Sequence, residues 1–490
     1  MVTTSTPFHP TPYPYQLHGA INAAWNGKRI IADEMGLGKT IQGLLTARLT
    51  GAHRILVICP PILTTNWAAE INRSGNLNTI HGAALTLITA GTPTPDALPE
   101  AGYVVASDAL TATRRPLQDL LAAWQPDLLL VDEAHRFKNP AARRTRAVTR
   151  IAATAGTAIC ITGTPIVSTP LDLLPLLKIT RTLHHIADTG RAYTDRYTRE
   201  IPWIPGKREP RTENLDELHA LLEQHVWTRR TKTQVLPQLP AKRRTVQHVT
   251  PDSATVRSAM DDLEGVITDW LAKHPNPTRE QIAEFTQDAL PFMSQLRRAT
   301  GLAKVPAAVD WISRHLDEQP AEPLIVWTIH RDVTTQIHAE TLKNRPRTRV
   351  RVLDGSQGHR ERSDAVEAFQ EGSVDVLIAQ IIAAGVGLTL TRSTTALFAE
   401  TDWTPANVAQ AEDRIHRIGQ TQPVTITTLI ADGTLDARIH AILANTISTL
   451  DKLTPGSDHH VTSGPGLDTT GPRDILTSLI REHLTNGAAA

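Results

Sequence analysis

The chain of 490 residues is long enough for about two to four domains, and its 40% apolar and 20% charged residues exclude a disordered protein. No apolar run approaches the ~20 residues that a membrane-spanning helix needs, and the N-terminus lacks the basic start and apolar stretch of a secretory signal. Both cysteines, Cys59 and Cys160, lie in apolar runs typical of buried, reduced thiols. We therefore expect a cytoplasmic protein that does not enter a membrane.

Charge is balanced over the whole chain but is unevenly distributed along it. Residues 1–245 carry 28 Lys and Arg against 19 Asp and Glu, whereas residues 246–490 carry 22 against 31. The first half would attract a polyanion, or alternatively the two halves attract each other. Arg outnumbers Lys by 39 to 11, and Ala and Thr are frequent, which favours a GC-rich genome such as that of an actinobacterium or its phage.

The first predicted element is a helix that begins near Leu17, because apolar residues recur there at helical spacing. These residues are Leu17, Ala20, Ile21, Ala24 and Trp25. Tyr13, Tyr15 and Gln16 come directly before them. The two tyrosine rings fit either stacking on a flat ligand or packing inside the fold.

A phosphate-binding loop is predicted in the string IIADEMGLGKT at residues 30–40. A short strand ends near Ile31 and a helix begins near Lys39. Between them, Gly36 and Gly38 allow backbone N–H groups to approach and wrap around a phosphate. This combination of strand, glycine-rich loop and helix is typical of proteins that bind nucleoside triphosphates.

The end of this loop carries the residue types that phosphate chemistry requires. Lys39 is expected to place a positive charge on the β and γ phosphates, and the Thr40 hydroxyl is expected to bind Mg²⁺. The string GxGKT is present, but Asp33 stands where the full Walker A pattern has glycine. The loop therefore differs from the general pattern at one position.

Four further strands are predicted because short apolar runs are bounded by turns and separated by helical stretches. They are Arg54–Cys59, Tyr103–Ala106, Leu128–Asp132 and Ala158–Thr162. The third belongs to the string DLLLVDEAH, which brings two adjacent carboxylates to the carboxyl end of a buried strand, where ligands bind in open α/β sheets. Asp132 is expected to hold Mg²⁺ through water, and Glu133 is expected to orient and deprotonate the attacking water.

Residues 180–300 are expected to form helical protrusions and the connection to a second α/β unit, because they are richer in charge and have few strand-like runs. A second set of apolar runs follows and predicts a second parallel sheet. Its strands are Leu324–Thr328, Arg351–Leu353, Val376–Ala379, Thr395–Ala399 and Val424–Ile430. The chain is therefore predicted to be an α/β protein with two parallel sheets.

The string QAEDRIHRIGQTQPV at residues 410–424 predicts a helix with one polar face. Gln410, Arg414 and Arg417 follow i, i+4 and i+7 and would share this face, which would point into a cleft. A neighbouring apolar stripe that can pack on the unit is formed by Ala411, Ile415 and Ile418.

The C-terminal segment divides into two parts. Residues 454–472 are rich in Gly, Pro and polar residues and indicate a flexible linker. After it, Asp474–Leu484 predicts a short amphipathic helix. The apolar residues that would form one side of this helix are Ile475, Leu476, Leu479 and Ile480.

Together, these strings resemble the superfamily 2 helicases, and more narrowly the Swi/Snf-type DNA translocases, over nearly the whole chain. The resemblance begins with DEMGLGKT at residues 33–40, where that family also has Asp33. Further similar strings are CPPILTTNWAAEI at 59–71, VDEAHRFKN at 131–139 with its DEAH box, ITGTPIVSTPLDLL at 161–174, LPQLPAKRR at 236–244, AAGVGLTLT at 383–391 and QAEDRIHRIGQTQPV at 410–424. The last string is the most specific of them.

Within this family the chain is most similar to the HARP-type annealing helicases. The similar strings are GTPIVSTP at 163–170, LAKVPAAVDWI at 302–312 and FAETDW at 398–403. No segment resembles the additional N-terminal modules of the eukaryotic HARP-type proteins, which leaves their fork-restoring role open. Where the family has Trp-Asn-Pro, this chain has Trp403, Thr404 and Pro405.

The resemblance implies two RecA-like lobes with parallel sheets and with helical protrusions between them. The first, ATP-binding lobe is expected at residues 1–245, with a protrusion from about residue 180. Residues 246–300 would form further protrusion and the interlobe connection, and residues 301–453 would form the second lobe. Residues 454–490 would be the linker and the short C-terminal helix.

The resemblance also implies how ATP and Mg²⁺ are bound. Gln16 would read the adenine edge beside Tyr15, and Mg²⁺ would be held through Thr40 and Asp132. Arg414 and Arg417, on the same face as Gln410, would reach the γ-phosphate from the second lobe. The loop residues that would contact the nucleotide are Asp33, Glu34, Met35, Gly36, Leu37, Gly38, Lys39 and Thr40.

DNA contacts implied by the resemblance lie in short loops of both lobes. Hydroxyl groups and loop N–H groups suit phosphate contacts, which position a strand without reading its sequence. The matching residues are Pro60, Thr64, Thr65, Asn66, Thr164, Gly355, Ser356 and Thr389.

The residues themselves indicate an ATPase that acts on nucleic acid, and the preference for a duplex is implied by the resemblance. We expect a monomeric, ATP-dependent translocase on double-stranded DNA, with forked DNA as a further substrate. Three alternatives stay open: a strand-separating DNA or RNA helicase, an annealing or fork-remodelling enzyme, and a non-catalytic ATP-dependent clamp. The intact Lys39, Glu133, Arg414 and Arg417 argue against the clamp.

Overall fold

The computed structural model describes residues 7–166, 169–200, 208–251, 254–275, 277–384, 388–403 and 405–437, together with four residues further on, His440, Leu476, Leu479 and Ile480. The chain forms two compact units. The first comprises mainly Met1–Arg199 and Pro210–Gln238, and the second mainly Leu239–Asp451. None of the described helices combines the length and the apolar character needed to cross a bilayer.

A seven-stranded parallel sheet forms the centre of the first unit, with the order β3-β4-β2-β5-β6-β1-β9. Its strands are β1 Ile30–Ile31, β2 Arg54–Cys59, β3 Ala84–Ile88, β4 Gly102–Ser107, β5 Leu128–Asp132, β6 Thr157–Ile161 and β9 Trp227–Thr228. Strands β4 and β5 are buried along their whole length. Helices on both faces of a parallel sheet explain why these strands are continuous apolar runs in the sequence.

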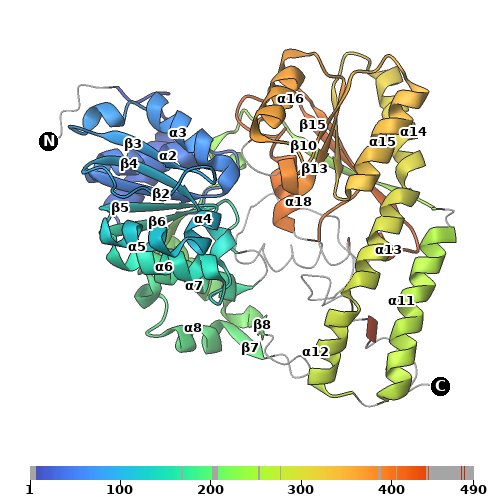
Figure 1. The fold of residues 1–490 in the computed structure, drawn as a ribbon, viewed down its shortest axis with the longest axis horizontal. Helices are drawn as coiled ribbons and strands as arrows, with labels where there is room; N and C mark the ends of the chain where they lie inside the picture. Colours follow the sequence, from blue (N-terminus) through green and yellow to red (C-terminus); the bar gives the residue numbers. More distant parts are fainter. Residues whose placement is uncertain are drawn as a thin grey trace. The chain divides into compact units, whose positions relative to one another are not determined.

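Helices cover both faces of this first sheet. Figure 1 shows α2 and α3 on one side and α5, α6 and α7 on the other. The helices of the first unit are α1 Pro14–Ala24, α2 Lys39–Thr50, α3 Thr64–Arg73, α4 Asp108–Thr113, α5 Arg115–Ala123, α6 Arg143–Thr154, α7 Leu174–Ile179, α8 Gly190–Tyr197, α9 Leu215–His225 and α10 Lys232–Val235. Two short strands, β7 Thr198–Glu200 and β8 Arg208–Pro210, pair separately from the large sheet.

The second unit has a six-stranded parallel sheet with the order β10-β15-β14-β11-β13-β12. Its strands are β10 Lys242–Val249, β11 Leu324–Thr328, β12 Val350–Leu353, β13 Val376–Gln380, β14 Thr395–Phe398 and β15 Val424–Ala431. Its helices are α11 Ala254–Lys273, α12 Arg279–Asp288, α13 Leu290–Ala303, α14 Val305–Glu318, α15 Arg331–Asn344, α16 His359–Glu371, α17 Ile381–Ala384 and α18 Pro405–Glu412.

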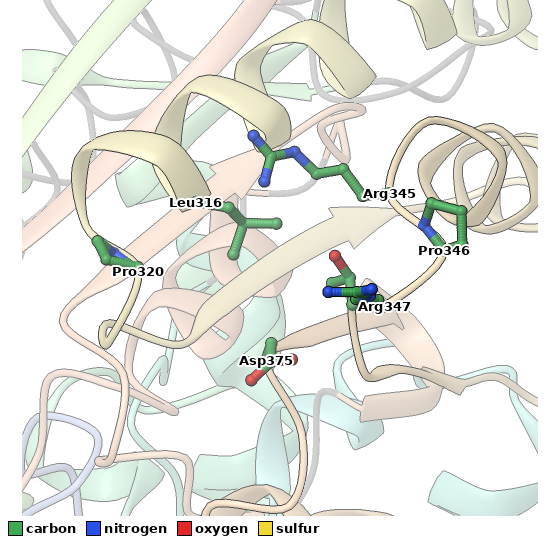
Figure 2. Close-up of a pocket in the computed structure, with 7 residues that line it drawn as sticks. Leu316, Pro320, Arg345, Pro346, Arg347 and Asp375 are labelled. Atoms are coloured by element: carbon green, nitrogen blue, oxygen red, sulfur yellow. The ribbon is translucent and has the colours of Figure 1, made fainter.

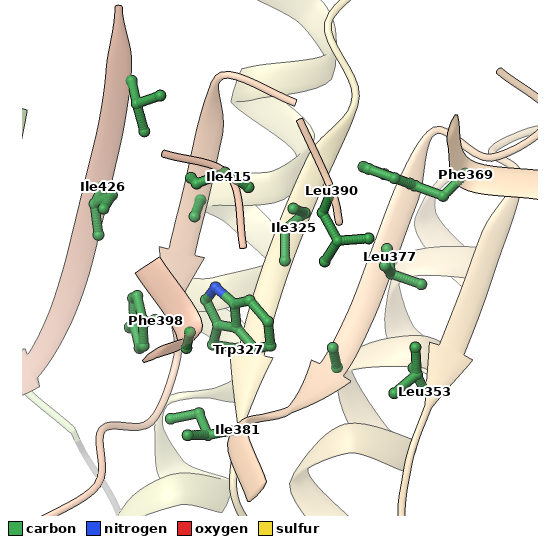
Figure 3. Packing of buried hydrophobic residues seen from close by; sticks show 14 of the residues in the cluster. Ile325, Trp327, Leu353, Phe369, Leu377, Ile381, Leu390, Phe398, Ile415 and Ile426 are labelled. Atoms are coloured by element: carbon green, nitrogen blue, oxygen red, sulfur yellow. The ribbon is translucent and has the colours of Figure 1, made fainter. Parts of the chain in front are cut away.

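One face of the second sheet is packed by large buried side chains. Figure 3 shows Trp327 on β11 next to Phe398 on β14, and their ring centroids are 6.0 Å apart. Leu390 and Ile415, which belong to connections between strands, complete this cluster. The connections that carry candidate site residues are therefore held by the core of the sheet.

A separate apolar cluster lies between α11 and α13. Of the predicted C-terminal helix Asp474–Leu484, the structure describes three residues as helical, Leu476, Leu479 and Ile480. Leu476 and Ile480 are fully buried in this cluster, as the predicted apolar side requires. The predicted linker, residues 454–472, lies outside the described residues.

The nine long strands predicted from apolar runs are confirmed, with ends that shift by one residue at most. Strand β10 corrects one expectation, because residues 242–245 were assigned to the first lobe. They pair in parallel with β15, so this stretch belongs to the second sheet. Charged and polar residues occupy most of β10, and exposed positions largely alternate with partly buried ones, which is why no apolar run indicated a strand there.

Candidate nucleotide-binding site

Three neighbouring strands of the first sheet, β5, β6 and β1, deliver the predicted nucleotide-binding residues to one place. The strands are parallel and hydrogen-bonded in this order, so their carboxyl ends share one edge of the sheet. The loop after β1 leads into α2, the pair Asp132 and Glu133 ends β5, and Gly163 follows β6 closely. This edge is where open α/β sheets bind ligands.

Glycine is required in the phosphate loop by both conformation and space. Gly36 and Gly38 have φ angles of 79° and 70°, and Gly38 is the N-cap of α2. A Cβ atom on Gly38 would lie only 2.3 Å from Nε2 of Gln16. The N–H groups at the start of α2 and the positive end of its dipole favour a bound phosphate.

Lys39 begins α2, and its ammonium group lies among the three loops. Its Nζ donates to the carbonyl of Glu34 at 3.2 Å. A Cβ atom on Gly163 would lie 3.1 Å from the same Nζ, so the loop after β6 approaches Lys39 closely. Burial and then Glu133 raise the pKa of Asp132, and the charge of Lys39 offsets part of this rise, so the cation lies near the carboxylate pair.

The predicted adenine residues lie against the phosphate loop. Gln16 is buried in α1, accepts from the N–H of Tyr13 at 2.9 Å and donates to the carbonyl of Leu37 at 3.1 Å. The Tyr15 hydroxyl donates to the same carbonyl at 3.1 Å. Tyr13 and Tyr15 stack on each other at 5.7 Å, and Arg230 lies over the Tyr15 ring. Burial first, and Asp33 next, raise the pKa of Tyr15 to about 12.

The residue that departs from the Walker A pattern, Asp33, has a structural role. Its fully buried carboxylate accepts from Arg230 at 2.7 and 3.0 Å and from Gln42 at 2.8 Å. Glu34 accepts from the backbone N–H of Lys232 at 2.7 Å. These side chains therefore tie the start of the loop to α2 and to the segment after β9. The sequence signal was the paired arginines that follow Trp227, because a buried aspartate requires a cation.

Asp132 is buried at the end of β5. One of its oxygens accepts from Nε1 of Trp67 at 2.8 Å, and the other accepts from the N–H of Glu133 at 2.9 Å. Burial first, and the neighbouring carboxylate of Glu133 next, raise the pKa of Asp132 to about 6. A cation bound nearby would reduce the repulsion between the two carboxylates and lower the pKa of Asp132. Trp67 was not among the predicted residues, although it lies in the string at 59–71.

Glu133 has left-handed backbone angles, with φ 48° and ψ 48°. This conformation is strained for a side chain other than glycine, asparagine or aspartate, and such strain gathers at functional sites. His135 Nδ1 lies 3.3 Å from a Glu133 carboxylate oxygen and 3.2 Å from the hydroxyl of Thr162. The turn aims the Glu133 carboxylate beside the histidine instead of along the strand.

The residues at this edge suit Mg²⁺, which prefers hard oxygen ligands and keeps several waters. Thr40 offers a hydroxyl from the first turn of α2, and Asp132 offers a buried carboxylate at the end of β5. Among the described residues, no three His, Cys, Asp or Glu side chains form a ready metal site. The remaining ligands would come from nucleotide phosphates and water. Such an ion would supply charge neutralisation at the phosphates.

The prediction of one helix from Gln410 to Arg417 is wrong, because α18 ends at Glu412. Beyond it, the backbone turns to tertiary partners: the carbonyl of Arg414 accepts from Leu390 at 2.9 Å, and that of Ile415 accepts from the Gln420 side chain at 3.2 Å. The predicted apolar residues Ala411 and Ile415 are nevertheless buried, whereas Ile418 is half-buried.

The two predicted arginines still converge in the second unit. Arg414 and Arg417 both donate to the carbonyl of Leu388, at 3.2 and 3.0 Å. Gln420 fixes the turn by donating to three carbonyls, those of Thr391, Ser393 and Ile415. Gln410 is buried at the end of α18. The turn, and not a helical face, brings the guanidinium groups together.

The predicted DNA contacts on the first unit lie at the carboxyl ends of β2 and β6. Pro60 and Thr64 are buried, and the Thr64 hydroxyl donates to the carbonyl of Pro61 at 2.8 Å. Thr65 and Asn66 are exposed at the start of α3. Thr164 is buried, and its hydroxyl has no hydrogen-bond partner among the described residues.

On the second unit, the predicted DNA contacts follow β12 or precede Leu390. Gly355 and Ser356 are exposed, and the Ser356 hydroxyl donates to Asp354 at 2.6 Å. The N–H of Gly355 donates to Gln380, the last residue of β13, at 3.2 Å. Thr389 is half-buried. The exposed hydroxyl and amide groups lie at the carboxyl edge of the sheet, as loop contacts to a phosphate chain require.

A phosphate loop and paired carboxylates on one parallel sheet, followed by a second parallel sheet with convergent arginines, define a helicase-type nucleotide hydrolase of superfamily 2 with two RecA-like lobes. The family model of the SNF2-related domain matches residues 20–298, and that of the helicase conserved C-terminal domain matches residues 307–419. The chain belongs to the SNF2-related family of DNA-dependent ATPases.

Curated relatives include the human DNA annealing helicase and endonuclease ZRANB3, which is 31% identical over 437 residues, or 88% of this chain and 39% of that protein. The Xenopus tropicalis SWI/SNF-related matrix-associated actin-dependent regulator of chromatin subfamily A-like protein 1 is 30% identical over 443 residues, 89% of this chain and 44% of that protein. The chain thus spans about two fifths of the length of these relatives.

A solved structure, the Sulfolobus solfataricus SWI2/SNF2 ATPase core in complex with dsDNA, is 22% identical and aligns over 97% of both chains with a TM-score of 0.42.

Proposed function

We propose that this protein is a monomeric motor that uses ATP hydrolysis to move along double-stranded DNA. The observation that carries the proposal is the meeting of Lys39, the pair Asp132 and Glu133, and Gly163 at one edge of the first sheet. Membership of the SNF2-related family supplies the DNA dependence.

The residues at this edge divide the work of hydrolysis. The N–H groups at the start of α2 and the charge of Lys39 bind the phosphates. Glu133 takes a proton from the attacking water, and the left-handed turn that holds it beside His135 fixes its direction. Asp132 is fixed by Trp67 and by the N–H of Glu133, and it would hold Mg²⁺ through water.

The second lobe completes the proposed cycle. Arg414 and Arg417 neutralise charge that develops on the γ-phosphate when the cleft is closed. Within the second unit, both guanidinium groups donate to the same acceptor, the carbonyl of Leu388. Closure and reopening then shift the DNA grips of the two lobes relative to each other.

A second candidate function is the annealing of DNA strands at forks. The observation that favours it is the 31% identity, over 88% of this chain, to a human protein named as a DNA annealing helicase. A motor that moves along a duplex without splitting it would drive two complementary strands together. Annealing would therefore be a consequence of the proposed movement and not a separate chemistry.

The test is ATP turnover measured side by side with single-stranded, duplex and forked DNA and with RNA, using Lys39→Ala as the inactive control. Duplex or forked DNA should stimulate turnover more than RNA does, and binding should weaken as salt rises because phosphate contacts release counterions. Equal stimulation by RNA, or efficient unwinding of a tailed duplex, would replace the translocase with a general helicase.

A further inference from the structure

An arginine-lined cavity of about 310 Å³ lies between α5 and α6 of the first unit. Arg115 and Gln118 from α5 face it, together with Arg143, Arg146 and Arg150 from α6. The three arginines of α6 follow i, i+3 and i+7 and so occupy one side of that helix. Convergence of four guanidinium groups from two helices on one hollow distinguishes this place from an ordinary solvated helix face.

The positive charge of the cavity is only partly neutralised. Asp119 is 2.6 Å from Arg150 and 3.5 Å from Arg115, and both ion pairs share one of its oxygens. In the described part of the chain, no carboxylate oxygen lies within 4.0 Å of Arg143 or Arg146. The cavity therefore presents a surplus of guanidinium groups to solvent.

Packing explains why these side chains are available. Val148 and Ile151, on the other side of α6, are fully buried. This anchoring leaves Arg143, Arg146 and Arg150 exposed. The core of the first unit thus fixes the position of α6, and the guanidinium groups of Arg143 and Arg146 are available to a ligand, whereas Arg150 pairs with Asp119.

We propose that this cavity binds phosphate groups of a second DNA segment, apart from the one on which the motor moves. A guanidinium group can donate two parallel hydrogen bonds to two oxygens of one phosphate. A row of guanidinium groups therefore suits a ligand with a row of phosphates better than a ligand with a single carboxylate. From Arg143 to Arg150 the helix rises by about 10 Å, and at 3.4 Å per nucleotide this covers about three phosphates of one strand. The first half of the chain also carries the net positive charge, with 28 Lys and Arg against 19 Asp and Glu.

The position of the cavity lets both sites work at once. Helices α5 and α6 cover one side of the first sheet, whereas the phosphate loop and the carboxylate pair lie at its carboxyl edge (Figure 1). DNA held at the cavity would leave the nucleotide loops free. This inference rests on the proposed function, since a motor at a fork meets more than one DNA arm.

A second cavity offers a control, because its charges are mostly paired. It measures about 450 Å³ in the second unit, and Figure 2 shows Arg345, Arg347 and Asp375 around it with Leu316 and two prolines. Arg345 pairs with Asp317, and Asp375 pairs with Arg349. Loss of charge at this cavity should leave DNA binding unchanged.

The test compares the double variant Arg143→Gln with Arg146→Gln against the control double variant Arg345→Gln with Arg347→Gln, whose two residues line the second cavity. Affinity for fluorescent forked DNA is measured by anisotropy at several salt concentrations, and ATP turnover is measured at saturating DNA. The first variant should bind forked DNA about tenfold more weakly. The slope of log affinity against log salt concentration should become shallower by about 1 to 2, which corresponds to the loss of about 1 to 2 phosphate contacts. Its turnover should stay within twofold of the parent, and the control should match the parent in every measurement.

Unchanged affinity in the first variant, or an equal loss in the control, would overturn the inference. A selective loss of poly-glutamate binding with unchanged DNA binding would also overturn it, in favour of an acidic polypeptide. Failure of the proposed function is separate, because it would show as turnover of the parent protein that DNA does not stimulate. Loss of DNA affinity at the cavity would still support the second site in that case.

Discussion

Two buried carboxylates, Asp132 in the first unit and Glu412 in the second, have opposite electrostatic surroundings. Asp132 lies beside another carboxylate, Glu133, and its pKa is raised to about 6, by burial first. Glu412 accepts from Lys242 at 3.0 Å and from Arg244 at 2.9 Å. Burial alone would raise the pKa of Glu412, but Lys242 and then Arg244 outweigh it, so this pKa is lowered.

The difference distinguishes the carboxylates of a candidate functional site from a carboxylate in a structural ion pair. The second unit satisfies Glu412 completely, as a structural ion pair inside a fold must be satisfied. The first unit leaves two carboxylates together at a cost in stability, which is typical of functional sites and agrees with the proposed roles of Asp132 and Glu133. Neutralising the first pair should therefore remove activity and spare the fold, whereas neutralising Glu412 should damage the fold.

The largest expected effect is that of Arg417→Ala on turnover. An arginine that acts on the transition state contributes about 10³- to 10⁵-fold in rate, whereas the fold loses one hydrogen bond to Leu388, about 1 kcal/mol. Turnover should fall far more than ATP affinity does. Melting temperature, ATP affinity and turnover are measured on one preparation. Gln420→Ala serves as the structural control, since that side chain donates to three carbonyls. A lowered melting temperature with unchanged turnover would make Arg417 a structural residue.

Glu133→Gln should lower turnover by about 10²- to 10⁴-fold, because it removes the proposed base and keeps the size of the side chain. ATP should still bind, because Lys39 and the start of α2 are unchanged. Single-turnover hydrolysis and nucleotide binding are the measurements. If affinity for ATP disappeared along with turnover, Glu133 would be a binding residue and not the base.

Glu412→Gln should destabilise the protein by about 3 kcal/mol, because it removes the carboxylate that pairs with Arg244 and leaves the buried Lys242 with Asp413, 3.7 Å away, as its remaining ion-pair partner. Denaturant unfolding gives the change. Asp332→Asn, which removes the partner of Arg298 at an exposed ion pair, is the matched control and should cost less than about 1 kcal/mol. Equal losses in the free energy of unfolding in the two variants would show that the burial of Glu412 does not increase the contribution of its ion pairs to stability.

The smallest expected effect is a pH-dependent gain in stability from Glu133→Gln. The pKa of Asp132 is raised in the folded state, so the folded protein binds more protons there than the unfolded chain between about pH 4 and 6. Stability is therefore lost as pH rises through this window. Removing the charge of Glu133 should recover about 1 kcal/mol at pH 7 and nothing near pH 4. A gain of equal size at both pH values would show that it does not come from the charge of Glu133 acting on Asp132.

The central strands of both sheets were predictable because a parallel sheet covered on both faces forces continuous apolar runs. The edge strands β3 and β10 were not predicted, since both have mostly exposed or partly buried positions and so lack a fully buried apolar run. The phosphate loop and the carboxylate pair were recognisable because their chemistry depends on a local order of residues, as in Gly36 to Thr40.

What the sequence could not provide are the contacts made across the chain. Arg230, which is 197 residues from Asp33, explains why an aspartate interrupts the Walker A pattern. Helical spacing around Arg414 also predicted a helix where the chain forms a turn. Local periodicity contains no information on the hydrogen bond that the N–H of Leu390 donates to the carbonyl of Arg414. Tertiary hydrogen bonds decided both positions.

The left-handed turn at Glu133 has a consequence for how such a chain changes over generations. An L-residue with a long side chain costs about 1 to 2 kcal/mol in this conformation, and glycine or asparagine would relieve most of it. Selection for heat resistance alone, in a copy freed from its task, would thus favour replacing Glu133 early. The protein encoded by such a copy would then be more stable and would bind the nucleotide without hydrolysing it. In the proposed mechanism, a glutamate at this position therefore lowers the stability of the fold for the sake of turnover.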